Sequence, residues 1–135
     1  MNALTTGQVA KVLIVSDDQF MVETVVAALP TGVFRIAMAT SGFDAGYQIA
    51  GFHPDALIVD FSIGYTEALQ ICQNLRRNAK FSEVIIVALL SQKPTPAILL
   101  DFGKVRITEF FLKPPLVRFL SMRLHALIGT KKDLV

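Results

Sequence analysis

Three apolar stretches of the sequence each end on charged side chains, and these groups together could carry phosphoryl-transfer chemistry. They are Asp17 with Asp18 after residues 11–15, Asp60 after residues 56–59, and Lys113 after residues 107–112. Two carboxylates that meet in one crevice repel each other unless a cation neutralises them. Only oxygen ligands are on offer, which favours Mg²⁺, and an ammonium group beside them would hold other phosphoryl oxygens. This set suits transfer of a phosphoryl group to the Asp60 carboxylate.

The same residues also have purely structural interpretations. Asp60 could simply end a strand and begin a turn. Lys113 could pair with a carboxylate without contacting any ligand. The three groups favour the chemical interpretation only if the fold brings the three stretches together.

The apolar pattern predicts the elements that must position these groups. Strands are expected at residues 11–15, 34–39, 56–59, 84–90 and 107–112, and helices at 19–29, 42–50, 66–78, 97–102 and 116–128. This fivefold alternation predicts an α/β, three-layer, flavodoxin-like (βα)5 fold with a parallel sheet in strand order 2-1-3-4-5. In that order the ends of the first and third strands meet at a switch point, where open α/β sheets bind ligands.

Local signals predict several helix ends and faces. Asp18 is expected to cap the first helix, and Gly129 to stop the last one. The third helix is expected to turn Leu69, Ile71, Cys72 and Leu75 towards the sheet and Gln70, Gln73, Arg76 and Arg77 towards water.

Composition limits the class of protein. The 135 residues are 53% hydrophobic and carry a formal charge of +2, which indicates one compact domain and gives no support for nucleic-acid binding. A single cysteine, Cys72, excludes an internal disulfide and fits a reducing compartment. The first residues lack the pattern of a signal peptide, and no apolar run reaches the roughly 18 residues of a membrane span. We therefore expect a cytoplasmic protein without a membrane segment.

The sequence resembles the receiver domain of two-component response regulators, in residues 12–18 (VLIVSDD), 55–60 (DALIVD) and 110–115 (FFLKPP). The resemblance covers residues 11–128 and places a receiver domain at residues 11–130. It implies that Asp60 is the phosphoacceptor and that Lys113 contacts the phosphate. It implies Mg²⁺ held by Asp17, Asp60 and the backbone carbonyl of Ser62, with Asp18 as a possible further ligand.

Partners also follow from the resemblance. It implies that a histidine kinase or phosphotransfer protein supplies the phosphate. It also implies that an output partner or a second copy binds the face made by the fourth helix, fifth strand and fifth helix.

Three positions depart from the family pattern. Ser16 stands where the family usually has the first acid of its pair, so the metal site is expected to be weakened. Ala88 falls where the family has a switching Thr or Ser, and Ser91 could replace it only if the fourth strand ran further. Phe110 has no hydroxyl at the position of the switching aromatic residue.

The chain ends are expected to lie outside the domain. Residues 1–10 are predicted to be a flexible leader and residues 131–135 a tail. Residues 4–11 resemble the opening of an excisionase-type helix-turn-helix, but the rest of such a module is absent. Direct nucleic-acid binding by this chain is therefore not expected.

Three functions compete at this point. The first is a receiver that accepts phosphate, and the second is a pseudo-receiver that acts as a phosphorylation-independent interaction module. The third is an aspartate-nucleophile phosphohydrolase, an enzyme class that needs a second acid two residues after its nucleophile. Ser62 occupies that position. We therefore expect a signalling protein and not an enzyme.

Overall fold

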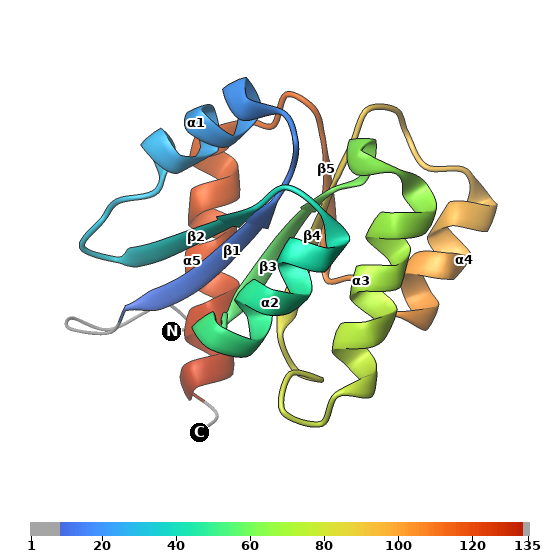
Figure 1. Ribbon diagram of the computed structural model, residues 1–135. Coiled ribbons are helices and arrows are strands. Elements are labelled where there is room, and N and C mark those ends of the chain that lie inside the picture. Colours follow the sequence, from blue (N-terminus) through green and yellow to red (C-terminus); the bar gives the residue numbers. More distant parts are fainter. Residues whose placement is uncertain (1–8, 134–135) are drawn as a thin grey trace.

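The computed structural model describes residues 9–133, which form one parallel five-stranded sheet covered by helices on both faces (Figure 1). The elements are β1 (Ala10–Val15), α1 (Gln19–Ala28), β2 (Phe34–Ala39), α2 (Gly42–Phe52), β3 (Ala56–Asp60), the 3-10 turn η1 (Phe61–Ile63), α3 (Tyr65–Arg77), β4 (Ile85–Leu90), α4 (Pro96–Lys104), β5 (Glu109–Leu112) and α5 (Val117–Asp133). The strand order is β2-β1-β3-β4-β5. The predicted flavodoxin-like fold is confirmed.

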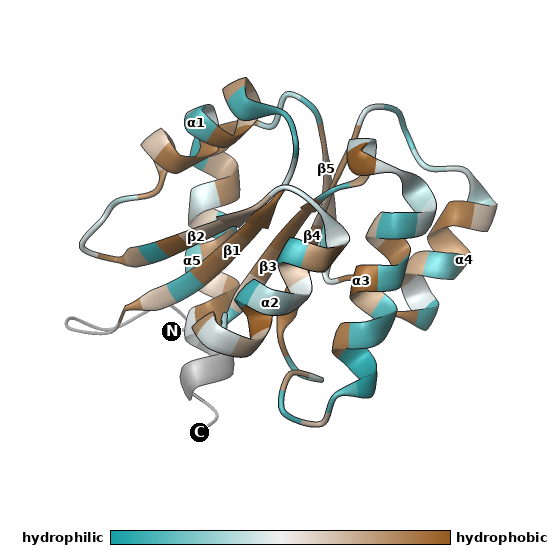
Figure 2. Cartoon of the chain, in the orientation of Figure 1, coloured by the Kyte–Doolittle hydropathy of each residue, from teal (hydrophilic) through white to brown (hydrophobic). Residues whose placement is uncertain are grey.

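The sheet forms because its central strands are apolar on both faces. Every residue of β3 and β4 is buried, and Figure 2 shows the inner strands brown along most of their length. One face packs against α1 and α5 through residues such as Val25 and Leu124, and the other packs against α2, α3 and α4 through Ile49, Ile71 and Phe102. Burial on both faces is typical of parallel strands between crossover helices.

The pairing of β3 sets the position of the functional residues. Val15, the last residue of β1, pairs with Val59, and Asp60 pairs with Leu89 of β4. The carboxyl ends of β1, β3 and β4 therefore lie at the same edge of the sheet. Lys113 follows β5 at this edge, where its backbone N–H donates to the carbonyl of Leu90.

Several predicted boundaries are wrong, each for a local reason. Strand β5 begins at Glu109, because the N–H of Ile107 donates to the carbonyl of Phe102 and so closes the turn that follows α4. Helix α4 is longer than predicted, since Thr95 caps it and proline begins it. Helix α5 passes through Gly129, where a glycine costs only about 1 kcal/mol in a helix that packing supports.

The chain ends also differ from the prediction where the structure describes them. Ala10 and Lys11 belong to β1, and Ala10 is buried, so these two residues are neither leader nor helix-turn-helix. Helix α5 extends to Asp133, into the predicted tail. The rest of the predicted leader, residues 1–8, and residues 134–135 lie outside the described residues. Within residues 9–133, no helix has both the length and the apolar character needed to cross a membrane.

Arg76 does not face water as the helical pattern predicted. Its guanidinium donates four hydrogen bonds to backbone carbonyls, those of Ser82 and Val84 before β4 and those of Val105 and Arg106 after α4, at 2.6–2.9 Å. One side chain therefore ties α3 to the segments on both sides of the β4–α4 unit. Helical periodicity does not predict this orientation of Arg76, because the long aliphatic part of an arginine side chain can lie along an apolar surface while its guanidinium reaches distant acceptors.

We expect Arg76→Met to lower the free energy of unfolding by about 2–4 kcal/mol, because several backbone acceptors lose charged donors at once. Arg77→Met is the matched control, since Arg77 is exposed on the same helix turn, and it should change stability by less than about 0.5 kcal/mol. Urea denaturation followed by circular dichroism measures both. Equal effects of the two substitutions would contradict the role given to Arg76.

Candidate functional site

The centre of the site is Asp60, which is 0% exposed at the carboxyl end of the central strand. Its Oδ2 accepts hydrogen bonds from Lys113 Nζ at 2.9 Å and from Ser16 Oγ at 2.8 Å. Its Oδ1 accepts the backbone N–H of Ser62 at 2.9 Å. The carboxylate is thus buried but fully surrounded by donors from β1, η1 and the end of β5.

The surroundings of Asp60 favour its ionised form. Burial raises the pKa of its carboxyl group, but the hydrogen bonds from Lys113, Ser62 and Ser16 outweigh burial, and the pKa lies below its ordinary value of 3.8. At neutral pH the side chain is therefore a carboxylate able to act as a nucleophile.

Lys113 connects the three strand ends. Its Nζ lies 2.9 Å from Asp60, 3.2 Å from Ser62 Oγ and 3.6 Å from Asp18 Oδ2. The ammonium group comes directly after β5, and the peptide bond that follows it, to Pro114, is cis. Lys113 therefore forms the ion pair that a purely structural role would require. Its ammonium group also lies where it could contact a phosphoryl oxygen.

The end of β1 contributes a hydroxyl and two carboxylates that differ in exposure. Ser16 is buried, donates to Asp60 and accepts the N–H of Asp18 at 3.0 Å. Asp18 caps α1, as predicted, by accepting the N–H of Met21. Asp17 is exposed, and within residues 9–133 the ion pairs of Lys113 reach Asp18 and Asp60 but not Asp17.

Ser91 also lies beside the residues around Asp60. Ser91 Oγ lies 2.9 Å from Ser62 Oγ, although β4 ends one residue earlier, at Leu90. Ala88, given the position of a switching hydroxyl, is instead buried in the apolar cluster beneath α3. Strand β4 ends at Leu90, as predicted, so the longer strand required for Ser91 to replace Ala88 is not observed, and the Ser91 hydroxyl contacts Ser62 from the loop after the strand.

An aromatic group joins the site to α4. The ring of Phe61, next in sequence to Asp60, lies 5.2 Å from the ring of Phe102 and 5.7 Å from that of Tyr65. Tyr65 donates its hydroxyl to Asp101 Oδ2 at 2.5 Å, and burial together with this carboxylate raises the pKa of Tyr65 to about 12. Movement of the loop after Asp60 would therefore press directly on α4.

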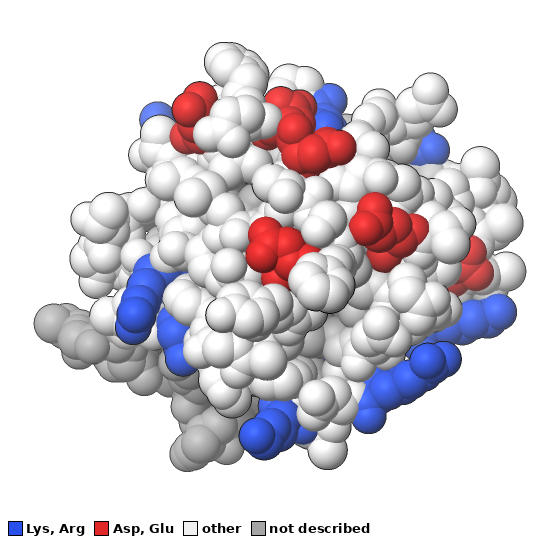
Figure 3. Space-filling model, viewed as in Figure 1, with Lys and Arg blue, Asp and Glu red and all other residues white. Residues whose placement is uncertain are grey.

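The donor chemistry of the site fits Mg²⁺ incompletely. Asp17, Asp60 and the carbonyl of Ser62 offer only oxygen ligands, which is the set that Mg²⁺ prefers. However, the described residues contain no cluster of three or more His, Cys, Asp or Glu side chains able to hold a metal. The hydroxyl of Ser16 and the ammonium of Lys113 also occupy Asp60 Oδ2. In Figure 3 most carboxylates of the visible face lie on its upper half. The carboxyl ends of the strands lie on the same half in Figure 1.

Comparison with known proteins gives a consistent result. A family model described as the response regulator receiver domain matches residues 12–122. The response regulator MprA of Mycobacterium ulcerans is 25% identical over 122 residues, which are 90% of this chain and 51% of that protein. MprA of Mycobacterium avium is also 25% identical, over 52% of its length. The chain thus spans about half the length of the curated relatives it matches.

Solved structures share the fold. A signal receiver domain from Bermanella marisrubri is 26% identical with a TM-score of 0.75 and covers 90% of this chain and 99% of its own. A two-component response regulator from Legionella pneumophila has a TM-score of 0.80 at 20% identity, over 90% of this chain and 98% of its own. The chemotaxis protein CheY4 of Vibrio cholerae has a TM-score of 0.78 at 21% identity, over 86% and 96%. The last two likenesses concern the fold alone.

The lowered pKa of Asp60 makes a pH prediction. A carboxylate whose pKa is lower in the folded state contributes stability above its unfolded pKa, and this contribution disappears as the pH falls through its folded pKa. Relative to Asp60→Asn, the wild type should therefore lose free energy of unfolding as the pH falls from 7 to about 3. Urea titrations across this range measure the difference. Asp17→Asn is the control, and a wild-type minus Asp60→Asn difference that stays constant with pH would contradict the assignment.

Proposed function

This chain belongs to the response regulator receiver domain family, and on that premise we propose that it is a signalling switch that accepts a phosphoryl group on Asp60. The observation that carries the proposal is the buried, ionised Asp60 carboxylate paired with Lys113 at 2.9 Å. Burying a carboxylate is costly unless a cation compensates for it, and a purely structural role would be served by an apolar residue. The arrangement is therefore better explained by chemistry than by stability.

The proposed reaction is a displacement at phosphorus. An oxygen of Asp60 attacks the phosphoryl group, a P–O bond forms, and the bond from phosphorus to the donor nitrogen or oxygen breaks with its electrons leaving on the donor. Lys113 contacts the transferred phosphoryl oxygens, and the Ser62 N–H orients the carboxylate. Response regulators interact with histidine kinases, so we propose a histidine kinase or phosphotransfer protein as the donor.

Mg²⁺ is part of this proposal. Receiver domains generally bind Mg²⁺ at their acidic pocket, and here Asp17, Asp60 and the Ser62 carbonyl would hold it, with Asp18 as a possible further ligand. The ion would neutralise charge on the phosphoryl oxygens. Ser16 removes one carboxylate from the set, so we propose weak binding. The buried free thiol of Cys72 supports the cytoplasm as the compartment.

A pseudo-receiver remains the second candidate function. Ser16 supports it, because its hydroxyl satisfies Asp60 in place of a metal-binding acid. Ala88 supports it too, since it offers no hydroxyl to a phosphoryl group. Receiver domains are signalling modules and not classical enzymes, so the phosphohydrolase alternative receives no support.

An exposed apolar surface supports the proposed output face. Its members lie on α4, on β5 and along the start of α5: Leu99, Leu100, Phe110, Leu112, Leu116, Phe119 and Met122. Strand β5 is an edge strand, and Glu109 pairs with Arg123 of α5 beside it. Large exposed apolar surfaces mark interaction sites. We assign this surface to an output partner or a second copy of the chain.

Incubation with Mg²⁺ and acetyl phosphate should add one phosphoryl group to the wild type, detected by intact mass spectrometry. Asp60→Asn should abolish the adduct, because the nucleophile is gone, and omission of Mg²⁺ should reduce it strongly. Ser91→Ala is the control that leaves the nucleophile in place. A wild type that stays unmodified under all these conditions would support the pseudo-receiver.

We expect the output face to bind a second copy with nearly the same affinity in both phosphorylation states. A ligand shifts an equilibrium only by its differential affinity for two states, and Ala88 gives the phosphoryl group no contact to gain. Sedimentation with and without acetyl phosphate measures the dimer constant, with Phe119→Ser as the control that weakens the face itself. A change above about tenfold (1.4 kcal/mol) that Ser91→Ala removes would assign the switching hydroxyl to Ser91.

A further inference from the structure

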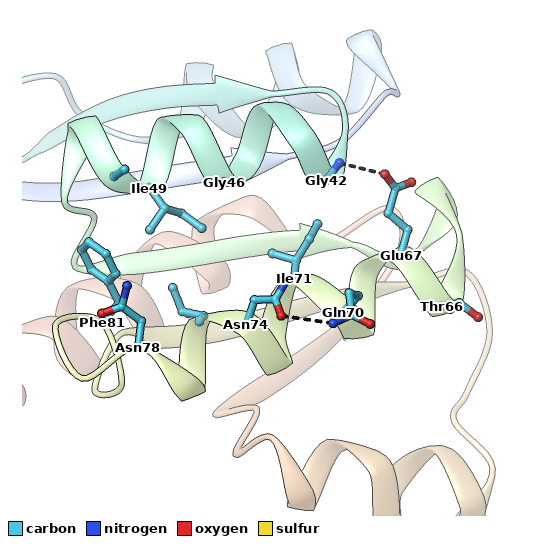
Figure 4. A pocket seen from close by; sticks show the side chains of 12 residues that line it. Gly42, Gly46, Ile49, Thr66, Glu67, Gln70, Ile71, Asn74, Asn78 and Phe81 are labelled. Atoms are coloured by element: carbon cyan, nitrogen blue, oxygen red, sulfur yellow. Dashed lines mark hydrogen bonds between the residues drawn. The ribbon is translucent and has the colours of Figure 1, made fainter.

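A cleft of about 650 Å³ lies between α2 and α3, on the same face of the molecule as α4 (Figure 4). None of the residues that line it belongs to the group around Asp60 and Lys113. Its volume falls within the roughly 300–1,000 Å³ of small-molecule sites. The phosphoacceptor chemistry leaves this cleft without a role.

The cleft is open because α2 presents almost no side chains to it. Gly42, Gly46 and Ala50 line it at four-residue intervals, on one side of the helix. A Cβ atom at Gly46 would meet nothing within 4 Å. At one end of the cleft, the N–H of Gly42 in α2 donates to Glu67 Oε2 of α3 at 2.8 Å, so this bond joins the two helices (Figure 4).

The floor is apolar and the helices that form it are held in place. Ile49 of α2, with Ile71 and Leu75 of α3, lines the cleft and also belongs to the core beneath it. Phe81, in the loop before β4, lines the opposite end of the cleft from Gly42 (Figure 4). The two helices cannot close the gap without moving these core side chains. Water against such a floor has few hydrogen-bond partners, so an apolar group that replaces it gains free energy.

The rim presents amide groups and one carboxylate. Gln70 Nε2 donates to Asn74 Oδ1 at 3.1 Å, and within residues 9–133 this leaves Gln70 Oε1 and the Asn74 amide N–H groups without a partner. The rim therefore offers a carbonyl oxygen as acceptor and amide N–H groups as donors to a polar group of a ligand. Among the described residues that line the cleft, Glu67 alone is ionisable, and its negative charge disfavours an anion.

We propose that the cleft between α2 and α3 binds a small, uncharged, largely apolar organic molecule that carries one hydrogen-bonding polar group. The apolar floor takes the body of the molecule, and the amide groups of Gln70 and Asn74 form hydrogen bonds with its polar group. Because the site shares no residue with the phosphoacceptor group, the proposal stands independently of the function of Asp60.

The test uses N-phenyl-1-naphthylamine, an uncharged aromatic probe with one N–H donor whose fluorescence rises in apolar sites. The wild type should bind it saturably, and Gly46→Leu should weaken binding by about tenfold or more, because the leucine side chain occupies the cleft. Gly103→Leu is the matched control: Gly103 is also helical, with open space at its Cβ, and it should change affinity by less than about twofold. Equal binding by the wild type and Gly46→Leu, or no saturable binding at all, would overturn the proposal.

Two further measurements test location and ligand class. In ¹H–¹⁵N spectra, the probe should shift amide signals of residues 42–50 and 66–78, whereas shifts confined to residues 110–119 would place it on the output face and overturn the proposal. Anilinonaphthalene sulfonate adds one negative charge to the same ring system, and it should bind about tenfold more weakly at this cleft. Equal affinity of the two probes would overturn the assigned ligand class.

Discussion

The ion pair between Asp60 and Lys113 is the interaction on which the site depends. A carboxylate at the end of a fully buried strand is tolerated only with compensating donors, and three separate segments supply them. These donors can converge only if β1, β3 and β5 end at the same edge of the sheet. The parallel topology and the charge therefore require each other: the sheet brings Lys113 to Asp60, and Lys113 allows Asp60 to be buried.

Serine hydroxyl groups lie around this pair, and one of them, that of Ser16, stands where the family pattern has an acid. Ser16 donates to Asp60, and Ser62 links Lys113 to Ser91. The Ser16 hydroxyl is neutral, so it donates to Asp60 without adding the repulsion that a second buried acid would bring. The same substitution reduces the charge available to a divalent cation. The weak Mg²⁺ binding that we propose would follow from this replacement of an acid by Ser16.

Two groups of contacts hold α3 and α4 in place. The rings of Phe61, Tyr65 and Phe102 pack between the loop after Asp60 and α4, while Arg76 binds carbonyls on both sides of the β4–α4 unit. Both contacts lie on the face of the sheet that carries α2, α3 and α4. On this face the glycines of α2 also leave the cleft beside α3 open.

The sequence by itself determined the fold class, the strand order and the helix cap at Asp18, because periodicity, apolar runs and capping are local properties. It also singled out Asp60 and Lys113 as groups that end strands. Only the tertiary structure decided which neighbours they meet: Ser91 beside Ser62, Asp17 left exposed, and Arg76 turned onto four carbonyls. Such contacts join residues far apart in the chain, and a side chain's partners depend on the geometry of several strand ends at once, which no local pattern encodes.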